Sequence, residues 1–412
     1  MSRSVLFRMA SGVLSIVSVN AYDVAAQTSP FGECRLGYWS STRNLDDTTD
    51  VSQALCFINW KPKISEHISF TLNLQAHDTN HRSTTGDQVN PREAFLDIQY
   101  DHWSMRFGRQ IIAWGRADRI NPTDYFSPRD FTLLVPEDED QRTGILAAQV
   151  QYHFTEATSV TVVAADFEKH RIPQGQLPSD VQFDEEPTDG EYAAKIDHVG
   201  ERLDWSMSYF RGYDRFIRFT PQLTSSSPSL KGYYPTTESF GLDFATAFSS
   251  WTARGELSRT EFSDDELGRY GENKRTVTRA TFGIDRDFFE TANINLQYFF
   301  IDRNYFPASF SGEFSPRLAT ALDRLNSDFD SFEKGFTLRV SNRFFNDQLK
   351  LELGAIGDAS NDSYLIRPRG YYSINDGFKI TLGLDKFLGE QYSYFGSREK
   401  NDTTFVELTY IF

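Results

Sequence analysis

The carboxy-terminal residues 401–412 alternate between two kinds of side chain, and this period of two constrains the fold more than any other feature. One face carries Val406, Leu408, Tyr410 and Phe412, and the other carries Phe405, Glu407, Thr409 and Ile411. Successive side chains of a strand point to opposite faces of its sheet. An apolar row opposite a mixed row is typical of a transmembrane β-barrel, in which one face meets lipid and the other a wet lumen.

The same alternation recurs along the chain, in residues 68–77, 93–100, 240–248, 292–300, 349–353 and 378–385. Helical spacing fits none of these segments. Short turns are expected near residues 101–102, 154–158, 200–201, 249–250, 289–290, 346–347 and 375–376. Longer polar loops are expected at 80–90, 116–143, 171–190, 214–237, 262–274, 304–332 and 390–401.

This asymmetry of connections predicts an all-β fold, a transmembrane antiparallel β-barrel with short periplasmic turns and long extracellular loops. The count is about 18 strands, with about 16 as the alternative because the first two strands and residues 362–375 alternate less regularly. Either number leaves room for an aqueous channel. Four tryptophans near predicted turns, namely Trp60, Trp103, Trp205 and Trp251, suit a membrane interface.

The amino-terminal segment 1–26 reads as a signal peptide, with Arg3 and Arg8 before an apolar run from Met9 to Val19 and cleavage expected after residue 21 or 26. The run is too short for a membrane anchor, which needs about 20 apolar residues. The mature chain, 27–412, is then one barrel domain placed in the bacterial outer membrane. The net charge of −16 argues against nucleic acid as a partner and suits contact with outer-membrane lipid and lipopolysaccharide.

The chain has two cysteines, Cys34 and Cys56. They are equidistant from position 45, in the expected turn between the first two strands, so they would face each other across a hairpin. A disulfide is plausible in an oxidising compartment. Two unpaired thiols are the alternative.

The densest motif is the run Gly108–Gly115, GRQIIAWG, followed by a loop rich in Pro, Asp and Arg. This combination resembles poorly characterised porin-like outer-membrane families of Gram-negative bacteria, and the final Phe412 resembles the carboxy-terminal signal read by the outer-membrane assembly machinery. In general porins the loop between strands five and six folds into the lumen, so the resemblance makes 116–143 a candidate constriction loop. An exposed loop with solvated charges is the alternative.

Candidate pore-lining and constriction residues come from this loop and from the polar rows of the wall. They are Arg106, Arg116, Asp118, Arg119, Asp124, Arg129, Asp130, Arg254, Arg279 and Arg339. The loop arginines are expected to pair with loop aspartates or with wall carboxylates, and some pairs would be structural braces. Acidic segments such as 184–186 predict a weak preference for cations.

An enzyme is not expected, because the seven histidines form no recognisable catalytic motif. No cofactor or metal is expected either: His77, Asp78 and His81 read as a solvated loop, and so does the acidic run Glu137–Asp140. The expected function is passive diffusion of small solutes through a water-filled lumen. The alternatives are a plugged barrel that moves a hydrophobic or lipid-like cargo with an inner-membrane pump or periplasmic partner, and a structural or adhesive barrel. A homo-oligomer is possible.

Overall fold

The computed structural model describes residues 29–45, 48–79, 88–172, 181–223, 228–263, 275–304 and 316–412. The expected signal peptide and its cleavage sites lie outside these ranges, as does His81. No helix in the described ranges is long and apolar enough to cross a membrane.

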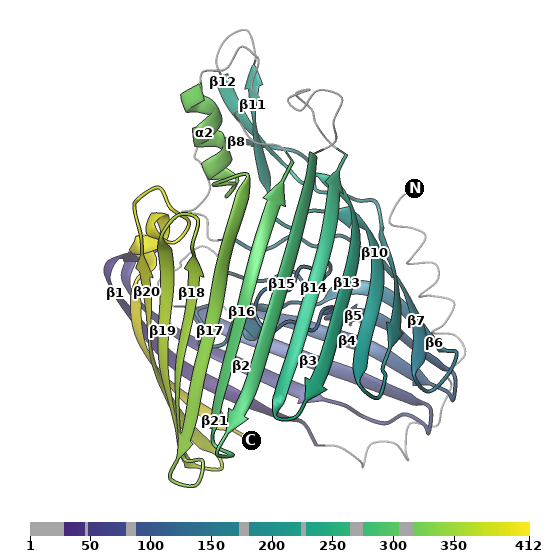
Figure 1. Cartoon of the computed structure of the whole chain (residues 1–412). Coiled ribbons are helices and arrows are strands. Elements are labelled where there is room, and N and C mark those ends of the chain that lie inside the picture. The colour runs from purple at the N-terminus through teal and green to yellow at the C-terminus, as the bar shows by residue number, and fades with distance from the viewer. Residues whose placement is uncertain are drawn as a thin grey trace.

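The chain forms a closed antiparallel barrel of 18 strands (Figure 1). Its strands, each paired with the next, are β1 (Phe31–Leu45), β2 (Thr48–Trp60), β3 (Ile68–Thr79), β4 (Gln88–Gln99), β5 (Trp103–Gln110), β6 (Ile145–His153), β7 (Thr158–Ala165), β9 (Glu191–His198), β10 (Leu203–Tyr213), β13 (Thr236–Phe248), β14 (Trp251–Phe262), β15 (Arg275–Phe288), β16 (Ala292–Arg303), β17 (Phe332–Phe344), β18 (Leu349–Asp358), β19 (Ser363–Asn375), β20 (Phe378–Leu388) and β21 (Thr403–Ile411). The prediction of 18 strands is confirmed, and the alternative of 16 is wrong because the less regular residues 363–375 form a full strand.

The first and last strands close the barrel. β1 pairs with β21 from Glu33 opposite Ile411 to Ser40 opposite Thr404. Gly32 and Phe412 then exchange two backbone hydrogen bonds, of 2.9 and 3.0 Å. Closure leaves no open sheet edge, which is the condition for a β-structure to cross hydrocarbon.

The two ends of the barrel differ in their connections (Figure 1). At one end, here called the turn end, short connections such as 249–250 and 289–291 join the strands, and both ends of the barrel domain meet there. The other end, here called the loop end, carries the longer connections, although 359–362 is short there too. The loop end also holds elements that the sequence did not predict: α2 (Pro316–Leu325) and a three-stranded sheet of β8 (Val181–Phe183), β11 (Arg218–Leu223) and β12 (Pro228–Tyr233).

The two faces of the wall follow the alternation. On β13 the outward Phe240, Leu242 and Phe244 are 61%, 45% and 36% exposed, whereas the inward Ser239 and Asp243 are buried. The four tryptophans named above all lie near the turn end of their strands. Outward-facing apolar rows thus surround a polar interior, as expected for a barrel in lipid.

Cys34 and Cys56 are direct partners in the β1–β2 register and form a disulfide, with 4.1 Å between their Cα atoms. Their neighbours in sequence, Arg35 and Leu55, are buried on the lumen side. The disulfide therefore lies on the outer face of the wall, beside the seam between β1 and β21.

Candidate functional site

The segment 111–144, between the fifth and sixth strands, turns into the barrel and contacts its wall on several sides. Its first attachment is apolar. Ile112, Trp114 and Phe126 join one buried cluster with side chains from the inner faces of β6, β7, β9 and β10, which are Ile145, Ala147, Val163, Ala165, Ala193 and Phe210. Trp114 and Phe210 both meet the Phe126 ring edge to face, at 5.5 and 5.1 Å between ring centroids. Each large side chain buried in this way contributes about 1.5–3 kcal/mol.

A second apolar attachment lies further along the loop. Leu133 and Val135 pack with Leu55 and Phe57 of β2. Beside them the Gln53 amide donates to the Leu134 carbonyl at 3.1 Å and accepts from the Leu134 N–H at 3.3 Å. The loop is therefore fixed both to the β6–β10 side of the wall and to β2.

A single buried carboxylate holds the start of the loop. Glu256 of β14 accepts from the N–H groups of Arg116 and Ala117 at 2.6 and 2.5 Å, and from the N–H and hydroxyl of Thr123 at 3.1 and 2.9 Å. Gly115 makes this approach possible, because a Cβ there would lie 2.6 Å from a Glu256 oxygen. Gly115 also has a φ of +97°, which favours glycine.

The rest of the GRQIIAWG motif is also explained by the attachment of the loop. Gly108 has a φ of +131° and lies directly against the Ala94 carbonyl. The buried Gln110 amide donates to the Ala147 carbonyl at 3.0 Å, and Arg109 pairs with Glu168 at 3.3 Å. The motif thus turns the chain out of β5 and packs it against the wall.

The charged side chains of the loop pair mainly with the wall. Arg116 contacts Asp197 of β9 at 2.8 Å and also pairs with Asp243 of β13. Asp118 pairs with Arg254 of β14 at 2.9 Å. The loop arginines were expected to pair either with loop aspartates or with wall carboxylates, and Arg116 pairs with wall carboxylates.

The acidic run Glu137–Asp140 is only partly solvated: Glu137 and Glu139 are exposed, but all four acids have partners, so the expectation of an unpaired, solvated run was wrong. Asp138 accepts two hydrogen bonds of 2.7 Å from Arg367 of β19, Asp140 pairs with Arg35 of β1 at 2.7 Å, and Glu137 accepts from the Tyr371 hydroxyl. Burial acts to raise the pKa of Asp138, but the Arg367 guanidinium outweighs it and holds that pKa below its ordinary value. Sequence alone could not place these wall arginines opposite the run.

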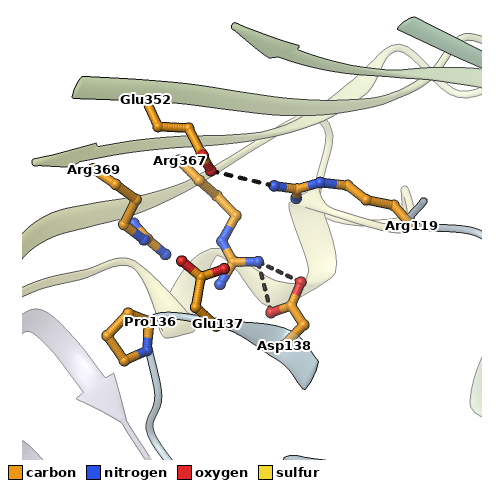
Figure 2. Close-up of a pocket in the computed structure, with 7 residues that line it drawn as sticks. All are labelled: Arg119, Pro136, Glu137, Asp138, Glu352, Arg367 and Arg369. Atoms are coloured by element: carbon orange, nitrogen blue, oxygen red, sulfur yellow. Dashed lines mark hydrogen bonds and ion pairs between the residues drawn. The ribbon is translucent and has the colours of Figure 1, made fainter. Parts of the chain in front are cut away.

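The same region forms a small polar cavity lined by Arg119, Pro136, Glu137, Asp138, Glu352, Arg367 and Arg369 (Figure 2). Arg119 points at Glu352, with 3.9 Å between the charged atoms. Burial lowers the pKa of Arg119, and Arg367 adds to the effect. The cavity therefore holds closely opposed charges of both signs.

Asp124 and Arg129 pair within the segment 111–144, whereas Asp130 also contacts the next long connection of the chain. Asp124 pairs with Arg142, and burial raises the pKa of Asp124 even though this guanidinium opposes the shift. Arg129 pairs with Glu139 at 3.4 Å. Asp130 accepts from the Thr132 N–H at 3.0 Å and lies 3.5 Å from Arg171. None of these pairs joins two of the loop residues named as candidates from the sequence.

The three remaining candidates are the wall residues Arg106, Arg279 and Arg339. Arg106 pairs with Asp97 on the neighbouring strand at 2.9 Å. Arg279 belongs to the inward row of β15, between the buried Val277 and Thr281.

Arg339, opposite Asn295 and Gly354 in the sheet, makes no hydrogen bond or ion pair with any residue that the structure describes.

Several residues of the site were not among the candidates, namely Arg35, Asp138, Glu256, Glu352, Arg367 and Arg369. For the five wall residues of this set, an inward-facing position on a strand was the only available signal, and it does not say which of them meet the loop; Asp138 was noted only as a member of the acidic run Glu137–Asp140. Within the described ranges, no group of three or more His, Cys, Asp or Glu side chains is placed to hold a metal ion.

The closed wall and the loop anchored inside it define a porin-type β-barrel. Among solved structures, this barrel is similar to OccK11 (OpdR) of Pseudomonas aeruginosa, with a TM-score of 0.53, 10% identity, and coverage of 93% of this chain and 95% of that one. OccAB1 of Acinetobacter baumannii gives a TM-score of 0.56 at 8% identity, covering 93% and 95% of the two chains. OccK8 (OprE) of Pseudomonas aeruginosa gives 0.54 at 11% identity, covering 93% and 97%.

No protein-family model matches the chain, and no curated protein is similar to it. At identities this low, the structural similarity shows the fold alone.

Proposed function

We propose that this protein is a bacterial outer-membrane channel for passive diffusion of small solutes, narrowed by the inward loop 116–143. The observation that carries the proposal is the attachment of this loop to widely separated parts of the wall. Glu256 of β14, Arg367 of β19 and Arg35 of β1 all hold it. A loop held across the lumen sets its width, and opposed charges along the remaining path set its selectivity.

The fold supports the proposed location. Solved barrels of this shape include outer-membrane porins. In this proposal the turn end faces the periplasm, and the signal peptide 1–26 directs secretion before assembly. Phe412 is read by the assembly machinery, so its removal is expected to lower the yield of folded barrel. An unchanged yield would remove that role.

Conductance in a planar bilayer tests the channel directly. The refolded wild-type protein should give stable current steps that scale with salt concentration. Deletion of 118–140 should raise the step size, because the deleted residues occupy the lumen, while the heat-dependent shift in gel mobility shows that the barrel still folds. Silence from folded wild-type protein would favour the plugged, partner-dependent barrel.

Unchanged conductance of a folded deletion variant would mean that the loop does not set the width. A salt gradient gives the ion preference in the same experiment. The acidic loops predict a reversal potential that weakly favours cations, and one that favours chloride would contradict this.

A further inference from the structure

Arg286 stands on the lipid-facing row of β15, close to the turn end. It is four residues after Phe282, which is 52% exposed on the outer face, so both side chains point to that face. The strand β15 ends at Phe288, two residues after Arg286. The direct partners of Arg286 in the sheet are Trp251 of β14 and Ile294 of β16, both apolar. An arginine facing lipid is costly near the bilayer midplane and much less so at the interface. The position thus places a cation at headgroup level.

The Arg286 guanidinium lies between two aromatic rings. Its central carbon is 5.0 Å from the Trp251 ring centroid and 4.6 Å from that of Phe288. Among the residues that the structure describes it forms no hydrogen bond or ion pair, and its Nε atom is buried without a partner. The rings orient the guanidinium, but they accept none of its strong hydrogen bonds.

No nearby carboxylate in the described part of the chain supplies the missing acceptor. Asp287 is adjacent in sequence, but it points to the other face of the sheet and accepts from the Asn293 amide at 2.8 Å. The next hairpin shows the contrast. There Arg343 has its own partner, Asp347, at 3.8 Å, and both side chains are more than half exposed.

We propose that Arg286, Trp251 and Phe288 bind the phosphate of a phospholipid in the leaflet at the turn end. A phosphate oxygen pair matches the planar fork of an arginine. The flanking rings suit the boundary between headgroup and acyl chain, where tryptophan is enriched. This proposal rests on the barrel spanning a membrane and is independent of whether the lumen conducts.

Native mass spectrometry of the detergent-solubilised barrel, titrated with phosphatidylglycerol, tests the site. Arg286→Gln should weaken binding by about fivefold, the contribution of one basic side chain near an anionic lipid surface. The control Arg343→Gln, which removes an arginine at the same end of the barrel but on the inward row of β17, should bind as the wild type does. Diacylglycerol, which lacks the phosphate, should not distinguish wild type from Arg286→Gln.

Equal affinities of wild type and Arg286→Gln would overturn the proposal, and so would an equal loss in Arg343→Gln, which would indicate a general charge effect. Displacement of the lipid by millimolar inorganic phosphate would also overturn it, because the site would then bind free anions. Trp251→Leu gives a second test if Arg286→Gln does not fold. It should also weaken binding, and an unchanged affinity would refute the role of the ring.

Discussion

Replacing Glu256 with glutamine removes the charge that holds the start of the inward loop. The native carboxylate accepts four hydrogen bonds, from Arg116, Ala117 and both donors of Thr123. A glutamine amide keeps one acceptor oxygen but turns an NH₂ group toward two of these donors. The Thr123 hydroxyl can rotate and accept, whereas a backbone N–H cannot, so one buried donor is left unsatisfied.

The expected cost follows from these contacts. A buried unsatisfied donor costs about 1–3 kcal/mol, and loss of the charge weakens the hydrogen bonds that remain, so Glu256→Gln should weaken the docking by about 2–4 kcal/mol. That corresponds to roughly 30- to 900-fold in the equilibrium between docked and released loop. The apolar attachments of Trp114 and Leu133 remain, so partial release is expected.

Single-channel recording measures this release. Wild-type current should be steady, whereas Glu256→Gln should switch between the native level and a higher one, with an unchanged heat-dependent gel shift. Glu238→Gln is the control, because Glu238 belongs to the neighbouring strand and pairs only loosely with Arg211, at 3.8 Å. If folded Glu256→Gln gave traces like those of the control, the carboxylate would not be an important anchor.

Three further predictions concern other parts of the structure. Gly115→Ala should produce the same current switching, because its Cβ would lie 2.6 Å from a Glu256 oxygen; steady traces would show that the loop adjusts. Burial lowers the pKa of His170 to about 3, below its ordinary 6.5, so its contribution to stability is full above pH 6.5 and is lost as the pH falls. The free energy of unfolding of the wild type, measured by urea titration, should therefore fall between pH 6.5 and 4 more steeply than that of His170→Gln, by up to roughly 1.4 kcal/mol per pH unit, and parallel curves would contradict this. Replacing both Cys34 and Cys56 with serine should lower the free energy of unfolding by about 3 kcal/mol, measured by urea titration, and an unchanged midpoint would show that the sheet alone holds this hairpin.

Much of the fold could be predicted because strand alternation is a local property. The alternation within residues 240–248 predicts which side chains face outward without information from any other strand. The pairing of Cys34 with Cys56 could be anticipated for a similar reason, since a hairpin sets its own register. The pairing of β8 with β12 could not, because it joins two loop segments distant in sequence. The helix α2 was also missed, inside the loop expected at 304–332.

The candidate site could be predicted from the sequence only in part. The motif at 108–115 marked the right loop, and the position between the fifth and sixth strands was evident from the count. The partners of its charges were not, as Asp138 shows. Four successive acids look like a solvated run until Arg367, far away in sequence, is brought opposite one of them.

The sequence by itself determined an all-β barrel of about 18 strands, the faces of its strands and the candidate constriction loop 116–143. Each of these depends on residues close together in the chain. Only the tertiary structure decided that Glu256 holds the loop, that the acidic run pairs with the wall, and that Arg286 has no hydrogen-bond acceptor among the described residues. Those facts depend on which side chains barrel closure brings within hydrogen-bonding distance across the lumen or along the outer wall. No local pattern encodes them, because inward parity says only that a side chain faces the lumen, not what it meets there.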